Sequence, residues 1–182
     1  MNALIYIVDT LLSLAVFVVL ARLLLQWVRA DFRNPIAQAI VRITNPLILP
    51  LRRVLPPVGE IDTASVIAVV LVTTIKVGIL FALTMYASPG VDLWIRDIVL
   101  ELVIALLNTY FYGIILYALL SLIAPGGYSP LQSVLASVCE PVLRPFRRLI
   151  PPIAGIDFSP LWAIIIIKAI LIWLGSVAPV IY

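Results

Sequence analysis

Long apolar stretches of the chain alternate with short segments that are rich in proline and arginine. Four of these stretches have roughly the 20 residues that a helix needs to span the hydrocarbon core of a bilayer. They are approximately Ala3–Trp27, Thr63–Ala87, Trp94–Ala124 and Phe158–Ile181. The pattern predicts four transmembrane helices. We expect the first to be a retained anchor and not a signal peptide, because it carries Asp9, lacks a basic start and has too long an apolar run.

Two connectors, one after the first stretch and one after the third, also show helical spacing. Each begins with a capping residue followed by proline, Asn34–Pro35 in the first and Ser129–Pro130 in the second. One apolar stripe follows in each connector: Ile36, Ile40, Ile43 and Leu47, and then Leu131, Leu135, Val138 and Val142. The opposite face is polar: Gln38, Arg42 and Asn45, and then Ser133, Ser137 and Glu140. We predict in-plane amphipathic helices that face either lipid or the ends of their own spans.

Prolines follow each stripe and lead to further predictions. Pro46 and Pro50 are expected to end the first amphipathic helix, because proline lacks a backbone donor. Arg52 and Arg53 would then lie in a short non-helical stretch. The pair Pro56–Pro57 favours a stiff, extended return toward the membrane.

The two connectors are near copies of one another. They contain NPLILPLRRVLPPVGEID, which ends at Asp62, and EPVLRPFRRLIPPIAGID, which ends at Asp157, at an offset of 95 residues. We therefore predict an all-α membrane protein made of two repeats, each a span, an amphipathic connector helix and a second span. The repeats cover residues 1–90 and 91–182, with connectors at 34–57 and 129–152. Because each repeat contains two spans, both repeats have the same orientation in the membrane. They should be related by an axis along the membrane normal.

The two aspartates that end the copied segments open the second and fourth spans. A carboxylate at this position is typical of a helix N-cap, where it accepts amide hydrogens at the positive end of the dipole. The alternative adds a salt bridge from an arginine of the same connector. Both interpretations place Asp62 and Asp157 at the membrane surface.

Composition and charge then fix the class of protein and its expected orientation. With 64% hydrophobic and 12% charged residues, the chain departs from soluble domains, in which about a quarter of the residues are charged. Most of the arginines lie between the first and second spans or between the third and fourth: Arg29, Arg33, Arg42, Arg52 and Arg53, and then Arg144, Arg147 and Arg148. The other side offers Arg96, beside Asp92 and Asp97. Because cytoplasmic loops collect basic residues, we predict cytoplasmic connectors and external termini.

The polar residues inside the spans form a second candidate site. Lys76 and Lys168 lie near the middle of their spans, where a lysine costs about 2.5–3.5 kcal/mol unless it faces protein or water. Asp9 and Glu101 are candidate partners, and Asn108 is a further polar residue. One interpretation is an ion pathway. The other is a pair of buried bridges, or lysines whose stems extend toward the surface.

The sequence gives no sign of an enzyme or of a bound cofactor. Histidine is absent, and the single Cys139 excludes an internal disulfide. The HExxH, GxSxG and P-loop motifs are also absent, and Ser65 and Lys76 are 11 residues apart without a supporting constellation. The formal charge of +3 is too small to indicate direct binding of nucleic acid.

The order of a span, an NP-initiated amphipathic segment, PLRRxxPP, ID and a lysine-bearing span resembles the YggT/YlmG family of small membrane proteins. The tandem form is similar to its longer proteobacterial members, which implies the bacterial inner membrane. The chain departs from the family pattern at Glu140 and at Ser159–Pro160, which implies that the two halves are not interchangeable. The resemblance implies links to osmotic or potassium tolerance and to neighbours of the division site. In plastids it implies links to nucleoid organisation and cytochrome maturation.

Two functions are expected from these observations. The first is a scaffold that binds anionic lipid or a membrane or division-related protein at the cytoplasmic face. The arginines expected to carry this binding are Arg42, Arg52, Arg53, Arg144, Arg147 and Arg148. The alternative is a small ion channel or ion-uptake component, which has to be a homo-oligomer because four spans leave little room for a pore. No filter motif supports it.

Overall fold

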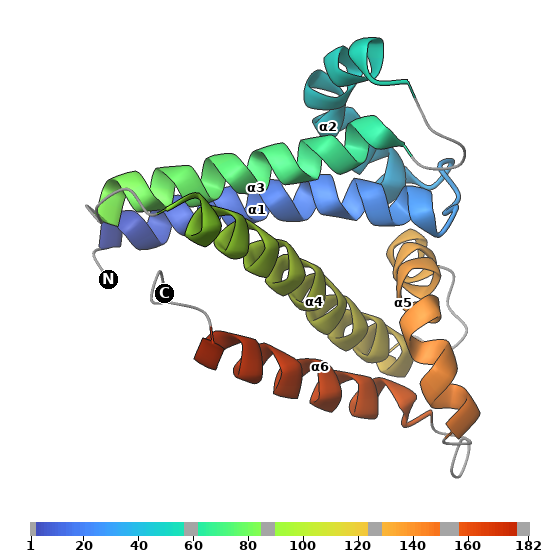
Figure 1. Cartoon of the computed structure of the whole chain (residues 1–182). Coiled ribbons are helices and arrows are strands. Elements are labelled where there is room, and N and C mark those ends of the chain that lie inside the picture. The colour runs from blue at the N-terminus through green and yellow to red at the C-terminus, as the bar shows by residue number, and fades with distance from the viewer. Residues whose placement is uncertain (1–2, 57–61, 85–89, 124–128, 150–156, 178–182) are drawn as a thin grey trace.

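The computed structural model describes residues 3–56, 62–84, 90–123, 129–149 and 157–177. In this part of the chain it contains the helices α1 (Ala3–Trp27), α2 (Pro35–Val54), α3 (Thr63–Thr84), α4 (Val91–Ile123), α5 (Pro130–Leu149) and α6 (Ser159–Val177) (Figure 1). The helices α1, α3, α4 and α6 are each long and apolar enough to cross a membrane. The predicted all-α membrane fold is confirmed. The predicted ends of the last three spans, at residues 87, 124 and 181, lie outside the described residues.

The helices follow the same order in both halves of the chain. α1 pairs with α3, α4 pairs with α6, and α4 also packs against α1 and α3. α2 and α5 lie at the same end of the molecule, while α1 begins and α6 ends at the opposite end (Figure 1). Both halves therefore point the same way, as expected of a parallel repeat.

The end of α1 is set by a hydrogen-bonded turn that redirects the chain into α2. Arg29 has a positive φ of 52°. The amide of Ala30 donates to Leu25 O at 2.9 Å, and the amide of Arg29 donates to Gln26 O at 3.1 Å. This is the bonding pattern of a Schellman motif, and Leu25 and Ala30 are both buried in one apolar cluster.

Asn34 starts α2 in the predicted way. Its side chain accepts a hydrogen bond from the amide of Ile36 at 2.9 Å, and Pro35 occupies the first turn. α5 begins at Pro130, directly after the predicted cap Ser129. Asn34 Nδ2 also donates to the carbonyl of Pro130 at 2.7 Å, so the two connector helices are joined where they begin.

The connector helices continue through their prolines, so the prediction that Pro46 and Pro50 end the helix is wrong. α5 likewise continues through Pro141 and Pro145. Prolines four residues apart share one face, and here that face is exposed. The carbonyls that lose a helical hydrogen bond therefore face away from the core. There, water or lipid headgroups can donate hydrogen bonds to them.

The arginine pairs consequently lie in the last helical turn and not in a loop. Arg52 and Arg53 lie in the last turn of α2, and Arg147 and Arg148 lie in the last turn of α5. Positive charge there is favoured by the negative end of the helix dipole. Extended backbone begins at Leu55, with φ −116° and ψ 95°. The predicted extended segment at Pro57, and its counterpart at Pro151–Pro152, lie outside the described residues.

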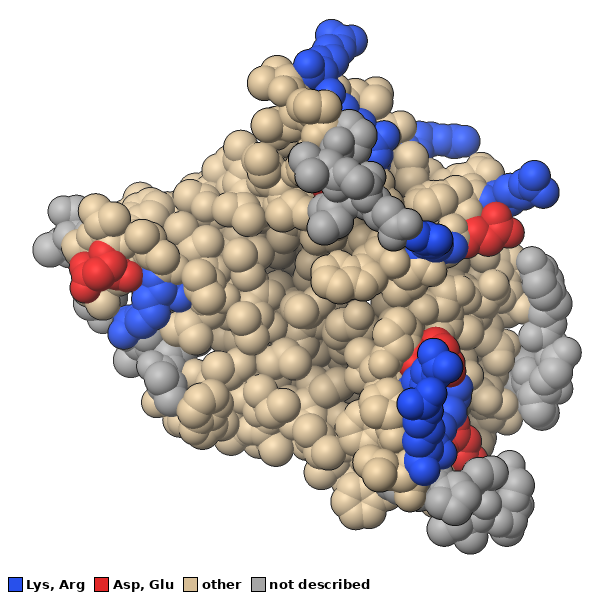
Figure 2. Space-filling model, turned by 45° about the vertical axis from the view of Figure 1, so that its right-hand side comes forward, with Lys and Arg blue, Asp and Glu red and all other residues tan. Residues whose placement is uncertain are grey.

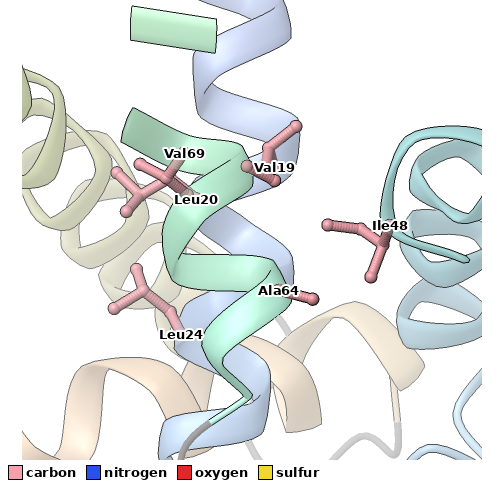
Figure 3. Packing of buried hydrophobic residues seen from close by; sticks show 7 residues of the cluster. Val19, Leu20, Leu24, Ile48, Ala64 and Val69 are labelled. Atoms are coloured by element: carbon pink, nitrogen blue, oxygen red, sulfur yellow. The ribbon is translucent and has the colours of Figure 1, made fainter. Parts of the chain in front are cut away.

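In each repeat one apolar cluster holds the connector helix against its own spans, and the two clusters are equivalent. Ile48 projects from α2 toward the α1–α3 pair and is fully buried (Figure 3). The first cluster joins α1, α2 and α3: Val19, Leu20, Leu24, Ile48, Ala64, Ala68 and Val69. The second joins α4, α5 and α6: Ile114, Cys139, Leu143, Ala163 and Ile167. Val19, Ile48 and Ala68 recur at the repeat offset as Ile114, Leu143 and Ala163, so the duplication preserved the packing.

The inner face of α2 is rotated relative to the predicted stripe. Its buried residues are Ala37, Thr44 and Ile48, whereas the predicted Ile43 is 67% exposed. Hydrophobicity alone could not place Thr44 inside, because its burial depends on a polar partner in another helix. The predicted alternative of packing on the spans is thus realised, and Ile43 and Leu49 remain exposed on the outside.

Candidate functional site

An arginine–aspartate pair joins each connector helix to the span that follows. Arg52 Nη2 lies 2.6 Å from Asp62 Oδ2, and Arg52 Nε lies 3.3 Å from Asp62 Oδ1. Arg147 Nε lies 2.8 Å from Asp157 Oδ2 at the equivalent position. Asp157 also accepts the amide of Ser159 at 2.9 Å, as an N-cap does. The two pairs realise the predicted salt bridge in both repeats.

The carboxyl group of Asp62 is the more tightly held of the two. It accepts hydrogen bonds from Arg52, from Ser65 Oγ at 2.6 Å and from Gln26 Nε2 at 3.0 Å. Burial by itself would raise the pKa of Asp62, but these hydrogen bonds outweigh it and lower the pKa to about 2. The pKa of Asp157 is lowered in the same way, against the effect of burial.

Arg22 is a further site residue that the sequence predictions missed. It lies in α1, five residues before the helix ends, and is 2% exposed. Its Nη1 donates to Thr44 Oγ1 at 2.7 Å, to Asn45 Oδ1 at 2.9 Å and to the carbonyl of Val41 at 3.2 Å. The signal was present, because an arginine inside an apolar span requires a partner. Arg22 lies inside the first apolar stretch, so a prediction from the arginines between the spans does not include it.

The second connector has a different arrangement at the equivalent place. Tyr117 stands where the first repeat has Arg22, and Glu140 stands where it has Asn45. Arg147 pairs with Glu140 through Nη1 and donates to Tyr117 Oη through Nη2 at 3.3 Å. Burial lowers the pKa of Arg147, but its hydrogen bonds to Asp157 and Tyr117 raise it to a greater extent. The structure thus gives the unusual Glu140 a partner within its own repeat.

The other four predicted arginines are exposed and are not used internally. Within the described residues none of them forms an ion pair; they are Arg42, Arg53, Arg144 and Arg148. Basic side chains gather over the connector end of the molecule (Figure 2). We name the surface of α2 and α5 that carries these four arginines the connector face. The six predicted arginines therefore divide into two that hold the frame and four that face outward.

Lys76 joins three spans through one ammonium group. It is 2% exposed, forms an ion pair with Glu101 and lies 3.0 Å from Asp9 Oδ1. It also donates to Ser13 Oγ at 2.7 Å. The predicted partners Asp9 and Glu101 are therefore brought to the same lysine. This contact links α1 and α4 to the middle of α3.

Lys168 is placed differently. Its side chain is exposed, and its Nζ lies 5.4 Å from the centroid of the Phe111 ring. Among the described residues no carboxylate forms an ion pair with it. The predicted buried bridge thus applies to Lys76 alone, while Lys168 has a cation–π contact.

One cavity collects all the predicted polar residues of the spans. Its volume is about 750 Å³, and it is lined by residues of α1, α3, α4 and α6. The five predicted residues in its lining are Asp9, Lys76, Glu101, Asn108 and Lys168. In the part of the chain that the structure describes, no three His, Cys, Asp or Glu side chains are grouped as metal ligands.

Comparison with known proteins decides the family. The sequence model of the family described as CCB3/YggT matches residues 1–83 and 97–178. The chain belongs to the CCB3/YggT family. An uncharacterized protein of Pseudomonas aeruginosa is 41% identical over 173 residues, covering 93% of this chain and 86% of that protein. The uncharacterized protein YggT of Escherichia coli K12 is 37% identical over 171 residues, covering 93% and 88%.

The resemblance seen in the PLRRxxPP…ID segments is confirmed by these matches. An uncharacterized protein of Haemophilus influenzae is also similar, with 30% identity over 169 residues that cover 93% of this chain and 87% of that protein. No solved structure matches this CCB3/YggT chain.

Proposed function

We propose that this CCB3/YggT protein is a non-enzymatic scaffold at the cytoplasmic face of the bacterial inner membrane. The main support is the pair of connector helices, which are fixed on their own spans and joined to each other through Asn34 and Pro130. They hold a charged surface in a defined geometry. Positive charge at this end favours a cytoplasmic connector face, with both termini external.

The exposed arginines are the residues we expect to bind. Each contributes about 1 kcal/mol toward anionic lipid near a membrane surface. A partner protein with acidic segments would meet the same charges, and a division-related membrane protein is the partner class that we favour. Arg52 and Arg147 fix the connector helices in place, because their guanidinium groups form ion pairs with Asp62 and Asp157.

Removing charge from the connector face tests the scaffold. A variant in which Arg42, Arg53, Arg144 and Arg148 become glutamine should lose its normal cellular distribution and its crosslinked partners while keeping its abundance. Arg96→Gln, at the opposite end, serves as the control and should change neither. Unchanged distribution and unchanged crosslinks in the quadruple variant would exclude the scaffold.

Orientation has its own test. A reporter fused after Tyr182 should give the signal of the external side. A reporter placed between Ser129 and Leu149 should give the cytoplasmic signal. The reverse result would place the arginines on the wrong side for this function.

A second function, ion conduction by a homo-oligomer, is favoured by the cavity of about 750 Å³ that contains Lys168. The exposed ammonium of Lys168 would lie beside the path. Potassium flux into vesicles that contain the purified protein tests this idea, with Lys168→Met as the variant. Conduction requires flux in the parent protein and a changed flux in the variant; absence of flux in the parent excludes it.

A further inference from the structure

A polar cavity of about 460 Å³ lies between α1 and the first connector helix. Its apolar lining comes from Phe32 and Val41. Its polar lining consists of Arg22, Gln26, Gln38, Arg42, Asn45 and Arg52. None of the described residues that line it is acidic. Three guanidinium groups around one cavity create a strongly positive potential, which favours an anion.

The guanidinium of Arg22 is buried and incompletely satisfied. Nη1 makes three hydrogen bonds, to Thr44, Asn45 and Val41. Nε is buried and has no hydrogen-bond partner among the described residues. A buried donor without an acceptor costs free energy. An anion bound in the cavity would bring acceptor oxygens to this guanidinium.

Asp62 does not neutralise the cavity. Its carboxylate is already held by Arg52, Gln26 and Ser65 at the edge of the site. With a pKa of about 2 it carries one negative charge at neutral pH. Arg22, Arg42 and Arg52 together exceed that charge, so the site remains positive.

The second connector has the opposite balance of positive and negative charge at the equivalent positions. Tyr117 and Ser137 replace Arg22 and Arg42, so only Arg147 remains of the three arginines. Glu140 replaces Asn45 and forms an ion pair with Arg147. With Asp157 the second site has one positive and two negative charges, whereas the first has three positive and one negative. Glu140 thus supplies internally the carboxylate that the first site lacks.

From this contrast we infer that the first connector binds one phosphate-type anion, held by Arg22, Arg42 and Arg52, and that Glu140 fills the corresponding place in the second connector. Guanidinium groups bind phosphate oxygens through paired, charge-assisted hydrogen bonds. The cavity is within the size range of small-ligand sites, so it can hold a headgroup or a free phosphate. This inference goes beyond the scaffold, because of the four arginines of the connector face only Arg42 lines the cavity, and anion binding does not require a partner protein.

The depth of the cavity is compatible with a lipid headgroup. Arg22 is five residues before the end of α1, which places it roughly 8 Å along the helix axis from that end. The rest of the lining comes from the connector, from Phe32 to Arg52, so a headgroup at the membrane surface can reach the cavity. Free phosphate could reach the same place from the connector side. The two sources share the chemistry and are separated by experiment.

Binding to the full-length protein in neutral detergent tests the site. Inorganic phosphate is measured by equilibrium dialysis. Phosphatidylglycerol is measured by native mass spectrometry, with zwitterionic phosphatidylcholine as the comparison. We expect one bound anion per chain. Arg42→Gln should weaken binding at least about tenfold, because it removes a charge-assisted hydrogen bond. Arg53→Gln removes the same charge outside the cavity and should change affinity less than about twofold.

A second variant separates loss of the site from loss of the fold. Asn45→Glu copies the second connector, keeps an acceptor for Arg22 and should abolish binding without lowering thermal stability. Phosphatidylglycerol binding alone would identify a lipid site, and phosphate binding would identify a site for soluble anions. Absence of binding by the parent, or equal binding by the parent, Arg42→Gln and Asn45→Glu, would overturn the inference. Neither result depends on cellular distribution, so the scaffold could fail or survive independently.

Discussion

The two connectors share a frame but differ in charge. Both use an arginine of the last helical turn to hold the aspartate before the next span, and both bury the same side of the helix against their own spans. Around that frame, Arg22 and Asn45 of the first repeat are replaced by Tyr117 and Glu140. After duplication, packing and the arginine–aspartate pair stayed constant, while the charge beside them changed sign. The conserved frame is therefore structural, and the differing charges are where the functions of the halves diverge.

The largest expected difference between the halves is in the stability lost when each lysine is replaced. Lys76→Met leaves Asp9 and Glu101 without their shared cation, which should destabilise the protein by about 3–5 kcal/mol. Lys168→Met removes only a cation–π contact and should cost less than about 1 kcal/mol. Unfolding of both variants in mild detergent measures the difference. Equal losses would show that Lys168 is also a structural residue.

A smaller effect is expected at the arginine pairs. Arg52→Gln and Arg147→Gln should each reduce the free energy of unfolding by about 1 kcal/mol, because solvent screens these partly exposed ion pairs. Arg53→Gln and Arg148→Gln are matched controls one position later and should change stability by less than about 0.5 kcal/mol. A control that destabilises as much as its neighbour would remove the distinction between frame and exposed arginines.

Acid should also weaken the frame. Asp62 has a folded pKa of about 2, below its unfolded value of about 3.9, so its ionised form stabilises the folded state. This contribution is fully present above the unfolded pKa and is lost as the pH falls through the folded pKa. The stability difference between the parent and Asp62→Asn should therefore shrink from about pH 6 to about pH 2.5. A constant difference would mean that Asp62 acts through packing and not through its charge.

Much of the fold was predictable because it depends on local spacing. Span lengths, the Asn34 cap and the 95-residue repeat all follow from short-range patterns. Helical depth alone also brought Asp9 and Glu101 into consideration for Lys76, and both are its partners.

The remainder depends on contacts between helices that no local pattern contains. Pro46 and Pro50 are tolerated because both lie on the exposed face, while burial of Ile48 holds the opposite face in place. Thr44 is buried because Arg22 reaches it from another helix. The cavity beside Arg22 was not predicted for the same reason: its residues meet only when α2 folds back onto α1.

The number of anions bound by an exchange variant tests the difference between the two connectors most directly. In this variant Tyr117→Arg, Ser137→Arg and Glu140→Asn give the second repeat the two missing arginines and the asparagine of the first. With whichever probe binds the parent, phosphate or phosphatidylglycerol, the parent should hold one anion and the folded exchange variant two. A count that stays at one would show that these residues do not make the site.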